Sequence, residues 1–232
     1  TSFGAVAAGW GWPLIAARTR LDELRPLVLQ VSLSGAAGTL AAMGPRGPEV
    51  RAGLAATLDL ADPDHSWHAD RSGITALAGF AASLAGSLGK LGEDLILLSQ
   101  SGLAEVSLGG GGSSSTMPQK QNPVAASALV ALARMVIGQA AILQGAGLHR
   151  QQRDGAAWFT EWLTLPQCCA GLGRMLGLAQ DCLNALRPEP EAMQAQMETS
   201  QGSLMAEALT FALARQMPRP QAEAQVKALL AK

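Results

Sequence analysis

The segment from Gly109 to Pro123 brings several kinds of chemistry together in a short stretch. Four glycines precede three serines, a threonine, a lysine and an asparagine. A serine hydroxyl can exchange a proton with carbon once a nearby cation and backbone N–H groups favour its alkoxide. Asn122 and Pro123 form a typical N-cap and first position of a helix, whose positive end would then point at this segment. The combination suits a small substrate with several carboxylates.

The same composition allows two other interpretations. Glycine and serine are typical of a mobile linker, here placed before an ordinary capped helix. A phosphate-binding loop would need a Gly-Lys-Ser/Thr ending, which positions a lysine and a hydroxyl around phosphate and magnesium, and the segment has no such ending. The residue types alone leave the linker and the carboxylate site open.

The overall composition excludes several other functions. With 17 basic and 18 acidic residues, the chain has no general attraction for nucleic acid. The spacing of Cys168, Cys169 and Cys182 fits neither a zinc site nor a disulfide framework, so we expect no metal and a reducing compartment, as for a cytoplasmic protein. The apolar stretch 123–148 carries Arg134 in its middle, so we expect no membrane span.

Long apolar helices are expected to position the segment. Tyrosine is absent, aromatic residues make up 4%, and no apolar/polar alternation persists, so the pattern predicts an all-α fold without strands. We expect long helices over about 5–31, 73–100, 123–148 and 155–186, with shorter ones near Met43, up to Asp62 and after Pro190. Helices about 40 Å long, apolar on much of their circumference, favour an oligomeric bundle. Residues 187–190 mark a boundary between a central bundle domain, 1–186, with its loop 109–123, and a C-terminal helical domain, 187–232.

The run Ser114-Ser115-Thr116-Met117-Pro118-x-Lys120-x-Asn122 closely resembles the signature loop of the fumarase/aspartase superfamily, Gly-Ser-x-x-Met-x-x-Lys-x-Asn. The resemblance implies a central bundle of long helices, a homotetramer whose active sites are shared among subunits, and addition or removal of a group β to a carboxylate. Residues 1–4, 8–10, 35–40, 67–68 and 158–166 resemble the cycloisomerase branch, whose members close a lactone ring on a carboxylated muconate. That branch uses no cofactor.

The resemblance also assigns the catalytic position. Ser114, the first hydroxyl of the matched motif, would carry the proton that joins or leaves the carbon next to a carboxylate, and Ser115 is the alternative. In a lactonisation, a substrate carboxylate attacks a conjugated double bond, and negative charge builds up beside another carboxylate before the proton arrives.

Other positions of the motif would bind the substrate. Lys120 and Asn122 would hold a carboxylate and stabilise the enolate-like intermediate, and Thr116 and Met117 would supply further contacts. The segment is therefore expected to provide both the proton carrier and much of the polycarboxylate site.

Two positions outside the loop complete the site that the resemblance implies. Arg153, in Gln152-Arg153-Asp154, is similar to the arginine of the family's Glu-Arg-Asp, whose planar fork binds an anionic group. His68 follows Trp67 in a region that lies near the site in relatives. The family's acid-side catalytic segment normally ends just before the position of Thr1, so we expect the chain to be truncated at its N-terminus.

Alternative functions stay open on the sequence. Adenylosuccinate lyase, a sister branch, eliminates fumarate and has a glutamate five residues after the signature asparagine, where this chain has Ser127. A helical scaffold that has lost catalysis is a third possibility. Trp158, Glu161 and Trp162 lie at helical spacing and are expected to pack or to form an interface.

Overall fold

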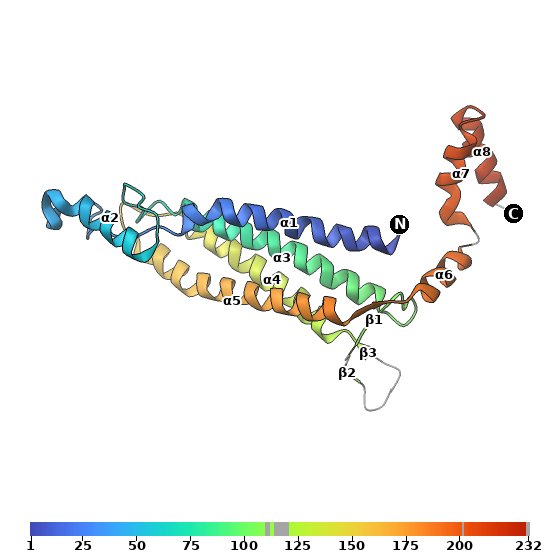
Figure 1. The fold of residues 1–232 in the computed structure, drawn as a ribbon, viewed down its shortest axis with the longest axis horizontal. Coiled ribbons are helices and arrows are strands. Elements are labelled where there is room, and N and C mark those ends of the chain that lie inside the picture. Colours follow the sequence, from blue (N-terminus) through green and yellow to red (C-terminus); the bar gives the residue numbers. More distant parts are fainter. Residues whose placement is uncertain (110–111, 114–120, 201, 231–232) are drawn as a thin grey trace. The chain divides into compact units, whose positions relative to one another are not determined.

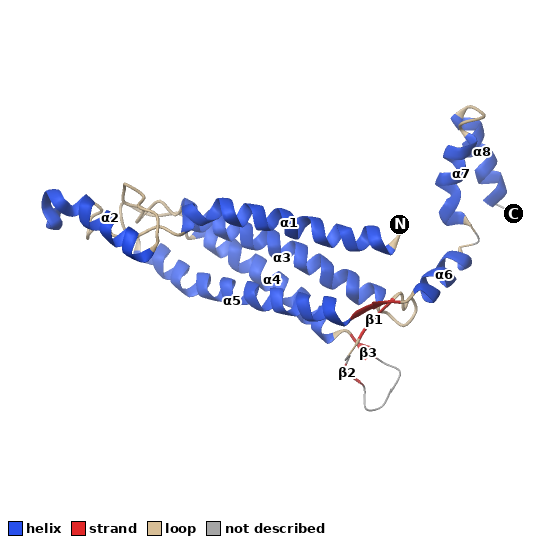
Figure 2. Ribbon diagram, viewed as in Figure 1, coloured by secondary structure: helices blue, strands red, loops and turns tan. Residues whose placement is uncertain are grey.

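Four long helices dominate the fold, as the apolar periodicity predicts. The computed structural model describes residues 1–109, 112–113, 121–200 and 202–230. The long helices run alongside one another in Figures 1 and 2, and they are α1 (Phe3–Val28), α3 (Ser72–Leu98), α4 (Val124–Gly145) and α5 (Gly155–Ala185). A short helical turn, η1 (Ala41–Arg46), leads into α2 (Gly47–Leu58). The predicted all-α bundle is confirmed, with the ends of the long helices shifted by at most three residues.

The chain divides into two compact units. The first comprises Thr1–Asp94 and Val124–Asn184 and contains the helical bundle; the second comprises Leu95–Pro123 and Ala185–Lys232. The segment 95–123 thus groups with the C-terminal helices, whereas the sequence suggests that it belongs with the bundle. The expected division at 186 and 187 stays a prediction.

The second unit contains short strands that the sequence pattern does not predict. β1 (Val106–Leu108) pairs antiparallel with β4 (Leu186–Pro188), and β2 (Gly112–Ser113) pairs antiparallel with β3 (Gln121–Asn122). Ladders of two or three residues are too short to show alternation, and β4 lies far along the chain from β1. The helices of this unit are α6 (Pro190–Thr199), η2 (Ser203–Met205), α7 (Ala206–Leu213) and α8 (Arg219–Leu230).

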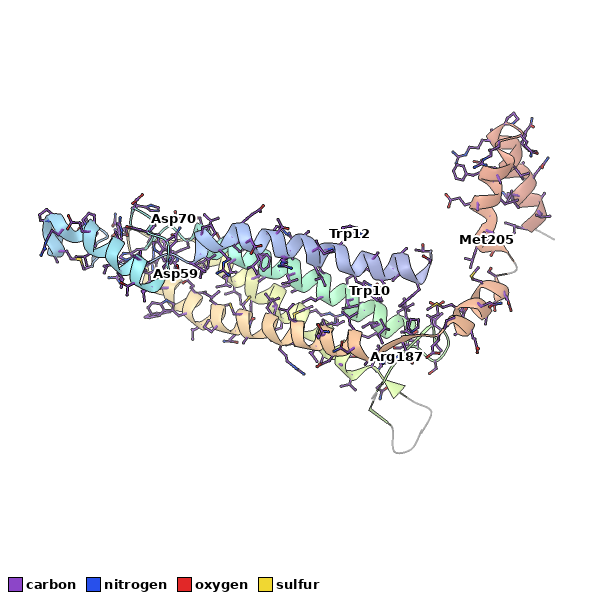
Figure 3. The ribbon with its side chains drawn as sticks, in the orientation of Figure 1. Trp10, Trp12, Asp59, Asp70, Arg187 and Met205 are labelled. Carbon is purple, nitrogen blue, oxygen red and sulfur yellow. The ribbon has the colours of Figure 1, made fainter. Side chains whose placement is uncertain are left out.

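Apolar side chains spaced three or four residues apart form the core of the bundle. On α3 they include Leu84, Leu88 and Leu91, and α4 contributes Leu129 and Val136 from the facing side. Helix α1 is anchored by Trp10, which is buried and whose indole N–H donates to Asp94 Oδ2 at 2.6 Å. Figure 3 labels Trp10 together with its neighbour Trp12, which is exposed.

Helices α3 and α4 are long and apolar enough to cross a membrane by length and composition. A core helix of a bundle passes the same test, and both helices contribute completely buried residues here, Leu88 and Leu129 among them. No membrane-spanning role follows from these two helices.

Glycines on α3 allow α4 to approach closely. A Cβ atom at Gly92 would lie 2.9 Å from Val130 Cγ2 and 3.0 Å from the Ala126 carbonyl oxygen. A Cβ atom at Gly86, six residues earlier on the same helix, would have no neighbour within 4 Å. The two positions share a helical backbone and differ in the space around them.

We therefore expect opposite effects from the same substitution. Gly92→Ala should lower the free energy of unfolding by about 1–3 kcal/mol, because the packed core must shift to admit a methyl group. Gly86→Ala, the matched control, should raise it by about 0.5–1 kcal/mol, because alanine loses less conformational entropy in a helix. Urea unfolding of both variants measures the difference, and a stabilising Gly92→Ala contradicts the close approach.

Candidate active site

Most of the signature-like loop lies outside the described residues. This applies to five of the expected site positions, which are Ser114, Ser115, Thr116, Met117 and Lys120. Asn122 is described, and it pairs with Gly112 in the short β2–β3 ladder. Helix α4 begins at Val124, one residue later than expected, so the predicted N-cap role of Asn122 is wrong. Asn122 instead ends the short strand β3, and Pro123 separates it from the first residue of the helix.

Asn122 lines a cavity of about 410 Å³ within the second unit. The polar part of its lining includes Ser99, Ser101, Ser107 and Glu189. The Ser107 hydroxyl donates to Glu189 Oε1 at 2.6 Å, and the Glu189 backbone N–H donates to the Glu105 carbonyl oxygen. The Glu189 carboxylate disfavours a second carboxylate in this cavity, so Asn122 alone does not make it an anion site.

His68 and Arg153 meet in the first unit around the indole ring of Trp158. The rings of His68 and Trp158 are in edge contact, with their centroids 5.7 Å apart, and the Trp158 indole N–H donates to the His68 carbonyl oxygen at 3.0 Å. The Arg153 guanidinium lies 4.6 Å from the centroid of the Trp158 ring and donates to the Ala36 carbonyl oxygen at 3.3 Å. The fold thus brings together two of the expected site residues from distant loops.

The His68 side chain is polar, buried and incompletely paired. Only 7% of its surface is exposed, and its Nδ1 atom has no hydrogen-bond partner among the described residues. Burial lowers the pKa of His68, and the charges of Arg153 and Arg71 lower it further. A neutral imidazole has one donor and one acceptor nitrogen, so His68 can hydrogen-bond a ligand without adding charge.

The lowered pKa of His68 predicts a pH-dependent stability. As the pH falls from about 6.5 toward the folded pKa, the unfolded chain takes up a proton that the folded protein does not, so the free energy of unfolding decreases. His68→Gln should flatten this dependence between about pH 7.5 and 5.5 in urea unfolding. His65→Gln, which replaces an exposed histidine, should leave the dependence in place, and equal flattening in both variants contradicts the assignment to His68.

Arg71 forms a buried, two-pronged ion pair with Glu161. Its Nε and Nη2 atoms donate to the two carboxylate oxygens at 2.8 and 2.6 Å, and the exposed fractions of the two side chains are 9% and 6%. The guanidinium also lies 4.5 Å from the centroid of the Trp67 ring and donates to the Trp67 carbonyl oxygen. Glu161 is buried as expected for a packing residue, but its charge and its partner make it part of the surroundings of His68.

Asp154 follows Arg153 directly and caps the start of α5. Its Oδ1 atom accepts from the backbone N–H of Ala156 at 3.0 Å, while Oδ2 accepts from the side chain and backbone of Arg150. The Arg150 guanidinium is the main reason that the pKa of Asp154 lies well below its usual range. Because this carboxylate is committed to the helix start and to Arg150, it does not neutralise Arg153.

The expected site residues thus divide between the units. His68 and Arg153 belong to the first, and Asn122 belongs to the second. No group of three histidine, cysteine, aspartate or glutamate residues that could hold a metal occurs within the described ranges.

The comparisons with known proteins agree with this fold. The sequence profile of the lyase family matches residues 1–138. A 3-carboxy-cis,cis-muconate cycloisomerase of Pseudomonas aeruginosa is 38% identical over 221 residues, which cover 94% of this chain and 48% of that protein. The chain spans about half the length of the curated relatives it matches.

Two crystal structures extend the likeness to three dimensions. A fumarate lyase from Mesorhizobium sp. BNC1 has a TM-score of 0.90 at 33% identity, covering 99% of this chain and 51% of that one. A 3-carboxy-cis,cis-muconate lactonizing enzyme from Pseudomonas putida has a TM-score of 0.87 at 34% identity, covering 97% and 50%. The chain therefore belongs to the lyase family, as the signature-like segment 109–123 predicts.

Proposed function

We propose that the protein containing this chain is a 3-carboxy-cis,cis-muconate cycloisomerase, which closes a carboxymuconolactone ring in protocatechuate catabolism by the β-ketoadipate pathway. The observation that carries the proposal is the 38% identity with the Pseudomonas aeruginosa cycloisomerase over 94% of this chain. The placement of Arg153 and the buried, polar His68 against the same Trp158 ring supports it, because the substrate is a polycarboxylate.

The proposed reaction is an isomerisation in which one substrate carboxylate adds to a double bond. A carbon–oxygen bond forms, the π bond breaks, and its electrons move to the carbon beside another carboxylate. Ser114 delivers the proton that this carbon receives, with Ser115 as the alternative carrier. Arg153, Lys120 and Asn122 bind carboxylates and stabilise the charge that accumulates there.

Binding also involves the remaining positions of the site. His68 contributes a neutral hydrogen-bonding group, and Thr116 and Met117 contribute contacts in the loop. The ligand is a small polycarboxylate, and no cofactor or metal takes part. The protein is cytoplasmic and binds neither nucleic acid nor membrane.

We further propose that the protein assembles as a homotetramer with shared active sites. The support is the amount of large apolar surface on the bundle helices of one copy. Trp12 on α1 is 69% exposed and Leu163 on α5 is 70% exposed, and α5 also exposes Phe159 and Trp162. Apolar faces of this extent are typical of interfaces between copies.

A second candidate is the elimination of fumarate from a succinyl adduct. The likeness to the Mesorhizobium fumarate lyase, at a TM-score of 0.90, favours it. Addition and elimination both need a proton carrier next to a carboxylate, so the groups proposed above serve either reaction. Ser127, which stands where adenylosuccinate lyase has a glutamate, counts against that particular substrate.

Ultraviolet absorbance separates the candidates. The purified protein is mixed with 3-carboxy-cis,cis-muconate, and the expected result is loss of the conjugated-diene absorbance without release of fumarate. The same protein is assayed with adenylosuccinate, from which we expect no fumarate. A preserved diene together with fumarate release overturns the proposal, and inactivity toward both substrates favours a helical scaffold.

A further inference from the structure

The Arg71–Glu161 pair differs from the other ion pairs of the described residues because both of its side chains are almost completely buried. The pair between Arg134 and Glu93, for comparison, lies on the surface with both side chains exposed. Removing two charges from water is costly, and apolar residues of similar volume often stabilise a protein at least as well. The buried pair therefore calls for an explanation other than stability.

The location of the Arg71–Glu161 pair supplies such an explanation. Glu161 lies one turn after Trp158 on α5, and Trp158 contacts the ring and the carbonyl oxygen of His68. Arg71 lies three residues after His68 and also holds the Trp67 carbonyl oxygen. The ion pair thus ties the 67–71 segment to α5 beside the contact between His68 and Trp158.

The pair also sets the charge around His68. Two guanidinium groups act on this imidazole, those of Arg153 and Arg71. Glu161 compensates Arg71, whereas Arg153 has no acidic partner among the residues that the structure describes. The nearby Asp70 carboxylate accepts from the Ser72 backbone N–H. Asp154 pairs with Arg150, so it does not compensate Arg153. The positive charge of Arg153 is therefore available to a ligand.

We propose that Glu161 is a positioning residue that, by holding Arg71, fixes the 67–71 segment against α5 and leaves a single uncompensated cation, Arg153, beside His68. The carboxylate ligand in this inference rests on the proposed function. The placement and charge of the His68 imidazole are independent of the proposed function, and they can be measured on the protein without substrate.

The test compares Glu161→Gln with Glu93→Gln, which makes the same chemical change in the surface pair. NMR titration of the ligand-free protein should show a lower pKa for His68 in Glu161→Gln, because the charge of Arg71 is no longer compensated, and no change in Glu93→Gln. Turnover of the substrate that the protein accepts should fall at least about tenfold in Glu161→Gln alone. Glu161→Asp, which restores the charge, should return the His68 pKa to its original value.

An unchanged His68 pKa in Glu161→Gln, or the same pKa in the Asp and Gln variants, overturns the proposal. If Glu161→Gln does not fold, the double variant Arg71→Met with Glu161→Leu decides, because it removes both charges together. A folded double variant should lose at least about tenfold in turnover. Full turnover in that variant shows that the pair is structural only. Absence of lactonisation with a shifted His68 pKa counts against the proposed function and not against this inference.

Discussion

Ser114→Ala is expected to lower turnover at least about a hundredfold while leaving the thermal unfolding midpoint nearly unchanged. Proton transfer by a positioned side chain contributes roughly 10²- to 10⁴-fold to a rate, and alanine removes the only group that could carry the proton at this position. A single hydroxyl in a glycine- and serine-rich segment contributes little to folding. The decrease should appear in kcat, measured by the loss of diene absorbance at saturating substrate.

Two neighbouring serines make the test specific. Ser113 stands at the leading glycine of the signature, a position without a hydroxyl in the family pattern, so Ser113→Ala should retain most of the turnover. Ser115 is the alternative proton carrier, and a large loss in Ser115→Ala with normal turnover in Ser114→Ala transfers the role to it. Normal turnover in both variants removes the hydroxyls of this loop from the mechanism altogether.

The long helices could be predicted because their periodicity is a local property of the sequence. The short strands could not, since β1 and β4 are defined by each other and lie about eighty residues apart. Asn122 is a single-residue example of a conformation that local sequence does not predict. Its position before Pro123 indicates an N-cap, but the helix begins at Val124, and Asn122 pairs with Gly112, a residue of another segment.

The candidate site, like the fold, could be predicted from the sequence only in part. Resemblance to the superfamily predicts His68 and Arg153 as site residues, but only the fold shows that both contact Trp158. The Arg71–Glu161 pair was not predicted, because its partners are ninety residues apart. One local feature could have indicated it: Glu161 is the only charged residue in the stretch 155–173, and a lone charge on a helix in a packed bundle needs a partner.

Replacement of Arg153 is expected to have the second large effect on activity. Arg153→Met should lower kcat/KM roughly 30- to 1,000-fold, since truncating one partner of a desolvated charge pair costs about 2–4 kcal/mol. Its stability should change little, because the Arg153 side chain is exposed, and its contacts within the fold are one long hydrogen bond to Ala36 and the packing against the Trp158 ring. Steady-state kinetics at fixed ionic strength measures the effect.

Arg153→Lys separates charge from shape. Lysine keeps the positive charge but loses the planar fork that can hold both oxygens of a carboxylate, so kcat/KM should recover only in part. Arg134→Met is the control, because it removes an arginine from the surface pair with Glu93 and should leave kcat/KM unchanged. A value for Arg153→Met within twofold of the original protein would mean that the cation beside His68 binds no substrate carboxylate, and the anionic group would then have to be held by Lys120 and Asn122.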